Sequence, residues 1–282
     1  MNTPKVSAII TTKNEEKNIG RLLKSIKNQS YRNIETIVVD NKSEDSTKKI
    51  ALKYTKKVFD KGPERSAQRN YGVSKAIGKY VFILDADMEL TKDVVKSCVE
   101  TIVKSSDKAL IVPERTVGKG LMANIRKFER EMYMGDPTVE VARFFDKDIF
   151  KKFGGYDAEL TGAEDYDLPW RISKKHSIGW SKKYIKHHEG GLTLVNQLKK
   201  KYYYASKSAK YAEKHPELVK TQGILIFRKA YLKNWKKFVL NPYLGFLLIL
   251  LRVLETTSAA IGYLSVVGPL EFAKTLWKAI AS

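Results

Sequence analysis

The first half of the chain alternates between short apolar runs and longer stretches in which apolar residues recur at helical spacing. Four runs predict strands: VSAIITT from Val6, NIETIVVD ending at Asp40, KVFD from Lys57 and YVFILDADMEL from Tyr80. The first is apolar at consecutive positions, as is typical of a strand covered on both faces. The stretches between them predict amphipathic helices, and the first of these carries Ile19, Leu22, Leu23 and Ile26. Alternating strands and helices predict parallel βαβ units, and therefore an α/β fold.

The same pattern continues toward residue 200. Helices are predicted over residues 93–106 and 118–136, with a strand at residues 109–114 between them. A strand and a short helix are predicted within residues 141–160, and a further helix follows the polar loop that begins at Thr161. Residues 199–237 are also helical by pattern, with YYYASKSAKYAEKH as the clearest piece.

Three of the predicted strands end in clusters of polar side chains. These clusters are Thr11–Glu15, Asp40–Asp45 and Asp85–Asp87. Ligands of parallel α/β sheets collect at the carboxyl ends of the strands. We therefore expect the three clusters to lie together and to form a binding site.

Asp85 and Asp87 are the most unusual of these residues, because they end a strand that is otherwise apolar. On a straight strand the two side chains would face opposite sides, but beyond the strand end the backbone can turn and bring them together. Two such carboxylates repel each other unless a cation joins them, and oxygen ligands suit Mg²⁺ or Mn²⁺. An Asp-x-Asp pair alone is also common in solvent-facing loops, so this alternative stays open.

The positive charge of the chain is concentrated after residue 170. The 282 residues carry a formal net charge of +21, and residues 171–237 hold 18 basic and only 3 acidic side chains. A basic segment of this kind favours an anionic partner, either nucleic acid or an anionic membrane surface. A solvated lysine-rich surface is the remaining alternative.

An apolar segment follows the basic one. Residues 238–272 contain only Arg252 and Glu255 as charged side chains before Glu271. Neither apolar half clearly reaches the ~20 residues that a membrane-spanning helix needs. We expect the two halves to form either a tilted hairpin or an in-plane membrane anchor. A helical hairpin buried in the globule is the alternative.

Five segments, in order, resemble family 2 glycosyltransferases. They are SAIITTKNEEKNIGRLLKSIKNQSY, IETIVVDNKSEDST, RSAQRNYGVSKAIGKYVFILDADMEL, GGYDAEL and GAEDYDLPWRI. The resemblance covers about residues 4–195 and implies the GT-A fold, a Rossmann-like, mostly parallel sheet flanked by helices. It also implies a nucleotide-sugar donor. With it, we expect a catalytic domain at residues 1–200 and, at residues 201–282, basic amphipathic helices and an apolar membrane-anchoring hairpin.

The resemblance implies that most of the polar residues at the strand ends bind the nucleotide sugar. Residues matching the family's nucleotide-sugar-binding positions are Thr11, Asn14, Glu15, Asp40, Arg69 and Asp85. Asp40 matches the acid that contacts the base or ribose, although a turn-stabilising aspartate is the alternative. The guanidinium of Arg69 would offset the charge of the diphosphate or hold the acidic residues in place, and Arg65 is a second candidate for this role.

The resemblance also implies a metal site and a catalytic base. Asp85 and Asp87 match the metal motif, with Asp87 favoured for direct ligation of Mg²⁺ or Mn²⁺; His187 is the chosen third ligand and His188 the reserve. A single carboxylate near the acceptor can remove its proton. Asp165 is assigned this role, and Glu164 is expected to position the acceptor. Asp167 is interpreted as a structural acid at a helix N-terminus.

These features together predict an inverting hexosyltransferase at the cytoplasmic face of the cell membrane. The donor is expected to be GDP-mannose or a UDP-hexose, and the acceptor a glycan or a polyprenyl- or dolichyl-linked compound. A soluble glycosyltransferase with a buried helical tail is one alternative. A basic nucleic-acid-binding protein is another, since Tyr202, Tyr203 and Tyr204 could stack on bases. It leaves the acidic strand ends and the apolar tail unexplained, so nucleic acid is not expected as a partner.

Overall fold

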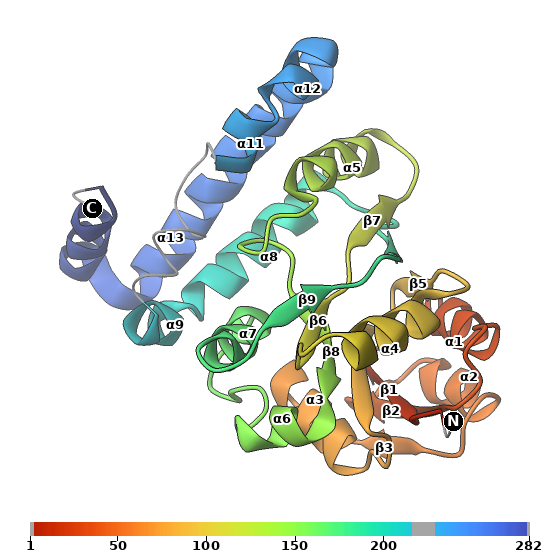
Figure 1. The fold of residues 1–282 in the computed structure, drawn as a ribbon. Coiled ribbons are helices and arrows are strands. Elements are labelled where there is room, and N and C mark those ends of the chain that lie inside the picture. The colour runs from red at the N-terminus through yellow and green to blue at the C-terminus, as the bar shows by residue number, and fades with distance from the viewer. Residues whose placement is uncertain (1–2, 216–228, 281–282) are drawn as a thin grey trace. The chain divides into compact units, whose positions relative to one another are not determined.

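A computed structural model describes residues 3–215 and 229–280. The chain folds into two compact units (Figure 1). The first unit contains Met1–Arg115, Glu140–Ala158 and Glu164–His188. The second contains Thr116–Val139, Glu159–Ala163 and Glu189–Ser282. The predicted division into a catalytic part before residue 200 and a membrane-anchoring part after it stays a prediction. The second unit also contains two earlier segments, Thr116–Val139 and Glu159–Ala163.

The first unit is built on a mixed, mostly parallel sheet. Its strand order is β3-β2-β1-β4-β8-β6-β9, with β8 antiparallel to both of its neighbours. The strands are β1 (Val6–Thr12), β2 (Ile34–Asp40), β3 (Val58–Asp60), β4 (Tyr80–Asp85), β6 (Ala109–Ile111), β8 (Ala142–Asp146) and β9 (Ile178–Trp180). The predicted α/β class is therefore confirmed, and three of the four apolar runs form the interior strands β1, β2 and β4. The fourth, β3, is a partly exposed edge strand.

Helices cover both faces of this sheet. The apolar sides of α1 (Ile19–Lys27) and α4 (Val94–Lys104) pack on one face. The other face is covered by α3 (Arg65–Ser74), α6 (Lys147–Lys152) and α7 (Glu164–Ser173), while α2 (Thr47–Leu52) follows β2. The α3 helix approaches the sheet closely, because a Cβ atom on Gly72 would lie 2.4 Å from Cγ2 of Ile9.

The predicted strand Tyr80–Leu90 is wrong as a single element. The strand β4 ends at Asp85, the chain turns at residues 86–87, and β5 (Met88–Leu90) joins a second, three-stranded sheet. In that sheet, of order β5-β10-β7, β5 pairs antiparallel with β10 (Ile185–His188), and β7 is Glu114–Val117. The change of sheet is the physical reason for the break, and it leaves Asp87 in the turn.

The second unit is helical. Its helices are α5 (Leu121–Tyr133), α8 (Leu194–Ser206), α9 (Ala209–Lys214), α11 (Lys229–Lys233), α12 (Trp235–Leu240) and α13 (Pro242–Ile280). Its apolar core joins Phe128 and Met132 of α5 to Tyr231 of α11 and to Leu248 and Leu251 of α13. The predicted helical character of residues 199–237 is confirmed where the chain is described, and residues 216–228 lie outside the described part.

The hairpin predicted within residues 238–272 is not formed. Arg252 and Glu255, which divide the two apolar halves, lie in one uninterrupted helical stretch of α13 that runs from Pro242 to a kink at Gly268, where φ is 78°. Pro269 follows directly, and the positive φ and the missing N–H group together explain the kink at this point. By length and composition alone, the Pro242–Lys274 part of α13 could cross a membrane.

Candidate functional site

The predicted polar clusters lie at one edge of the large sheet. The parallel register places Thr12 opposite Asp40, and Thr11 opposite Asp85. The buried Asp40 accepts hydrogen bonds from Oγ1 of Thr12 at 2.8 Å and from the backbone N–H of Ser43 at 2.7 Å. These are the contacts of a turn-stabilising aspartate, the alternative that the sequence left open. A role for Asp40 in contacting base or ribose stays a prediction.

The loop after β1 is connected to the loop after β2. Asn14 has a positive φ of 54°, and its backbone N–H donates to Oγ of Ser43 at 2.8 Å. Glu15 follows, with its backbone N–H donating to Oγ1 of Thr47 at 2.7 Å. Burial raises the pKa of the Glu15 carboxyl, and the negative charges of Asp87 and Asp85 raise it further. Glu15 therefore lies within electrostatic reach of the predicted metal pair.

Arg69 connects three acidic residues from different parts of the first unit. Its guanidinium is fully buried on α3, with Nη2 3.0 Å from Oδ1 of Asp85. Nη1 lies 2.5 Å from Oδ1 of Asp165 and 3.1 Å from Oε1 of Glu164. The predicted binding residue Arg69 and the predicted catalytic residues are thus in direct contact.

A second arginine, which the sequence analysis did not single out, also binds Asp85. Nη1 of Arg143 lies 3.2 Å from Oδ2 of Asp85. Burial opposes ionisation of Asp85, but the charges of Arg69 and Arg143 hold its pKa well below the usual range. Both Asp85 oxygens therefore face cations. The available signal was a lone arginine in the apolar strand ARFFD.

Asp87 lies in a different environment from Asp85. Nε2 of His187 is 3.1 Å from Oδ2 of Asp87, and Nδ1 of His187 is 2.8 Å from Oε2 of Glu114. Burial lowers the pKa of His187, but its two carboxylate partners raise it to about 9. His188 points to another partner, with its Nε2 2.7 Å from Oε2 of Glu89. Of the two candidate histidines, His187 is the one beside Asp87.

One oxygen of Asp87 is available to a cation. Oδ1 of Asp87 is buried and has no hydrogen-bond partner. The described residues include no cluster of three or more His, Cys, Asp or Glu side chains that could hold a metal ion. Mg²⁺ in phosphate-binding sites takes only one or two protein carboxylates and fills its shell with water and phosphate oxygens. Asp87 could therefore hold such an ion together with a diphosphate, and His187 could join it by releasing a ring proton, because a histidine binds metal only in its neutral form.

The two acids at the start of α7 differ in accessibility. The Asp165 side chain is 24% exposed, whereas that of Glu164 is 4% exposed. Burial, and then the charge of Asp165, raise the pKa of Glu164 to about 7. Asp167 is fully buried and lies 2.6 Å from Nη2 of Arg171, as expected of a structural acid. Asp165 is therefore the more accessible of the two acids.

Comparison with known proteins places residues 7–156 in a known family. Residues 7–156 match the sequence model described as "Glycosyl transferase family 2". The chain is 31% identical over 186 residues to the GalNAc(5)-diNAcBac-PP-undecaprenol beta-1,3-glucosyltransferase of Campylobacter jejuni, covering 56% of this chain and 58% of the relative. Among three of the curated relatives that it matches, the chain spans 31% to 58% of their length.

Solved structures support the same assignment at the level of the fold. The mannosyltransferase PcManGT of Pyrobaculum calidifontis, in complex with GDP-Man and Mn²⁺, superposes with a TM-score of 0.58 at 18% identity, covering 100% of this chain and 81% of that one. Staphylococcus aureus TarS 1–349, in complex with UDP-GlcNAc, gives 0.54 at 20% identity, covering 98% and 88%. These neighbours confirm the predicted GT-A fold. The family match covers more than half of the residues, and the chain therefore belongs to glycosyl transferase family 2.

Proposed function

We propose that the protein is an inverting hexosyltransferase that uses a nucleotide-diphosphate sugar and a lipid-linked acceptor. One observation carries the proposal: the buried Arg69 contacts both Asp85, beside the predicted metal site, and Asp165, the predicted base. A donor diphosphate and an acceptor hydroxyl would therefore meet within the reach of one side chain. Such proximity is what a single displacement requires.

The donor side of the site is assigned to the ends of β1, β2 and β4. Thr11, Asn14, Glu15 and Asp40 are proposed to contact the nucleotide. Asp87 and His187 are proposed to hold Mg²⁺ or Mn²⁺, which would neutralise charge on the leaving diphosphate. The neighbours bound to GDP-Man with Mn²⁺ and to UDP-GlcNAc support this chemistry. GDP-mannose or a UDP-hexose is the proposed donor.

Asp165 is proposed to remove the proton from the attacking acceptor hydroxyl. Its ion pair with Arg69 fixes the position of the carboxylate. Glu164 shares the same arginine and is proposed to position the acceptor. Asp85, ionised between two arginines, orients both cations toward the developing negative charge.

A lipid-linked acceptor and a membrane location are supported by three observations. The C. jejuni relative is named as a glucosyltransferase for a PP-undecaprenol compound. Residues 171–237 are strongly basic, and α13 is long and apolar. Work at the cytoplasmic face of the cell membrane is proposed on this basis, with a polyprenyl- or dolichyl-linked acceptor.

The experiment that tests this function measures hexose transfer directly. Labelled GDP-mannose and several UDP-hexoses are incubated with the full-length protein, polyprenyl phosphate or a lipid-linked glycan, and Mg²⁺, Mn²⁺ or EDTA. We expect metal-dependent transfer from one donor to a lipid-extractable product. Failure of every nucleoside diphosphate to bind by calorimetry in the presence of Mn²⁺ would refute the donor site itself.

A further inference from the structure

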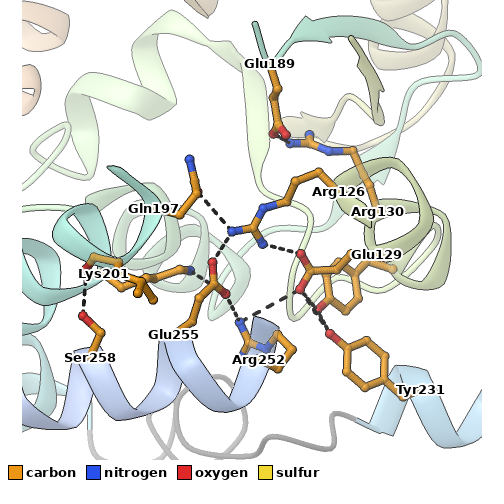
Figure 2. A network of polar contacts seen from close by, with 12 residues as sticks. Arg126, Glu129, Arg130, Glu189, Gln197, Lys201, Tyr231, Arg252, Glu255 and Ser258 are labelled. Carbon is orange, nitrogen blue, oxygen red and sulfur yellow. Dashed lines mark hydrogen bonds and ion pairs between the residues drawn. The ribbon is translucent and has the colours of Figure 1, made fainter. Parts of the chain in front are cut away.

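Two charged residues lie buried in the middle of the long apolar helix α13. Arg252 and Glu255 of α13 are 5% and 1% exposed. Glu255 is bound by the guanidinium of Arg126, which comes from α5 (Figure 2). Nη1 of Arg252 donates to Oε2 of Glu255 at 3.1 Å and lies 4.0 Å from Oε1 of Glu129. The centre of α13 is thus held to α5 by ion pairs within the second unit.

The same helix also packs tightly along α8. Oγ of Ser258 donates to the backbone carbonyl of Leu198 at 2.8 Å, and the hydroxyl of Tyr202 donates to Oγ of Ser265 at 3.1 Å. Between these contacts a Cβ atom on Gly262 would lie 2.3 Å from the backbone oxygen of Tyr202. The two backbones therefore touch, and α13 cannot enter a bilayer without carrying α8 with it.

The α8 helix is unsuited to a hydrocarbon environment. Lys199 and Lys200 are exposed on it, next to the segment that contacts Ser258, and Lys201 lies 3.9 Å from Glu255. If α13 crossed a bilayer, these ammonium groups and the ion pairs of Figure 2 would lie at the depth of the acyl chains. Charged groups at that depth are strongly unfavourable. These contacts argue against a membrane-spanning α13.

The opposite side of α13 carries an uncharged apolar stripe. Its exposed residues recur every three or four positions or at multiples of that spacing: Tyr243, Phe246, Leu250, Val253, Ile261 and Leu264. At about 1.5 Å per residue the stripe is roughly 30 Å long. The charged residues of this part of the helix, Arg252 and Glu255, are both buried. The helix therefore presents charge inward and apolar side chains outward along its length.

The helices before α13 add a mixed apolar and basic surface. Leu232, Trp235 and Val239 are exposed at helical spacing on α11 and α12. Lys233 and Lys236 are exposed between them. Tryptophan and lysine side by side are typical of helices that lie at the boundary between lipid and water. A dimer interface with a second copy of the chain would not require lysines between the exposed apolar residues.

We infer that α13 lies in the plane of an anionic membrane surface, with its apolar stripe in the lipid and α8 on the water side. This inference rests on the membrane location given under the proposed function. Of a membrane-spanning and an in-plane arrangement of α13, it selects the in-plane one. The occupant of the stripe is the headgroup and acyl boundary of the bilayer. Lysines of α11 and α12 contact the anionic headgroups.

Depth-dependent quenching tests the in-plane arrangement. Single cysteines replace Phe246, Val253 or Leu264 in the full-length protein and carry a fluorophore, while the fully buried Cys98 remains unlabelled. The vesicles are phosphatidylcholine with phosphatidylglycerol and nitroxide lipids. We expect shallow nitroxides to quench all three labels to a similar extent. Deep quenching confined to the Val253→Cys label would instead establish a spanning helix and overturn the inference.

Binding variants separate lipid from protein partners. Phe246→Ser combined with Leu250→Ser should weaken vesicle binding by about tenfold or more, since two apolar side chains no longer enter the lipid. The matched control is Ile77→Ser, an equally exposed apolar residue of the first unit. Absence of wild-type binding to these vesicles, or a vesicle-free dimer that the double variant abolishes, would overturn the inference. Nucleotide binding is measured separately, so a missing donor site would be distinguishable from a missing membrane site.

Discussion

Asp165 and Glu164 show how one arginine can give two adjacent acids different properties. Both bind Nη1 of Arg69, but only Asp165 is substantially exposed. The raised pKa of Glu164 follows from its burial and from the neighbouring negative charge. The assignment of Asp165 as base and Glu164 as positioning residue stays a prediction, and each residue can be tested by a different measurement.

Replacing Asp165 by Asn should remove the base while preserving the shape of the site. We expect the rate of transfer to fall by roughly 10²–10⁴-fold, with the Kd for the nucleotide sugar nearly unchanged. Single-turnover transfer and calorimetric donor binding are the measurements. The control is Glu159→Gln, an exposed acid paired with Lys210. A loss of only a few-fold in Asp165→Asn would remove this residue from the role of base.

The adjacent histidines provide a matched pair for the metal site. His187→Ala removes a group 3.1 Å from Asp87, whereas His188→Ala removes one bound to Glu89. We expect affinity for Mn²⁺, measured by titration with a nucleoside diphosphate present, to fall about 10–100-fold in the first variant only. Equal effects in the two variants would contradict the assignment of His187.

Glu164 should make folding depend on pH. Its pKa is about 7 in the folded protein against an ordinary 4.5, so the folded state retains a proton that the unfolded chain releases between these values. Stability should therefore fall as pH rises from 5 to 8. In Glu164→Gln, the free energy of unfolding should fall by roughly 1–3 kcal/mol less between pH 5 and pH 8 than in the unaltered protein. Urea unfolding in EDTA measures this difference. Parallel pH profiles for the two proteins would refute the shifted pKa.

At the scale of elements, consecutive apolar positions were sufficient to predict the central strands. Val6–Thr12 has the predicted bounds and Ile34–Asp40 has the predicted end, because strands buried on both faces have no polar alternation to obscure them. The partners Arg143 and Glu114 were missed because each belongs to a different strand. Nothing in the local sequence indicates that Arg143 contacts Asp85 and Glu114 together.

The uninterrupted helix through Arg252 and Glu255 was missed for a related reason. Arg252, Glu255 and Ser258 interrupt the apolar run, and such polar residues are typical of the turn in a hairpin. In the structure each has a partner: Glu255 binds Arg126 and Arg252, and Ser258 donates to Leu198. Polar residues can therefore lie in the middle of an apolar helix when other helices supply their partners, and these partners cannot be seen in the local sequence.

The close packing of α3 on the sheet gives a prediction at the same scale. Gly72→Ala would place a methyl group 2.4 Å from Cγ2 of Ile9, so the helix or the strand must shift. We expect the free energy of unfolding to fall by about 1–3 kcal/mol, measured by chemical denaturation. The control is Gly190→Ala, where a Cβ atom meets nothing within 4 Å. Equal stability of the two variants would show that α3 can move at no cost.

For the whole molecule, α13 belongs to the core of the second unit. Truncation after Asn241 removes Leu248 and Leu251 from the cluster around Phe128 and leaves Arg126 without Glu255. We therefore expect the truncated protein to aggregate, as measured by size-exclusion chromatography with light scattering. A monodisperse truncated protein with unchanged helix content in α5 would contradict this role of the tail.

The second unit collects three separate stretches of chain, two of which leave and re-enter the first unit. Thr116–Val139 and Glu159–Ala163 are followed in each case by strands or helices of the glycosyltransferase sheet. A single genetic crossover would therefore replace only part of the helical unit. It would separate α5 from the helices of Glu189–Ser282 with which α5 packs. Recombination between relatives would be restricted to exchanges that carry both units together, so that the sheet and the helical unit are inherited as one piece.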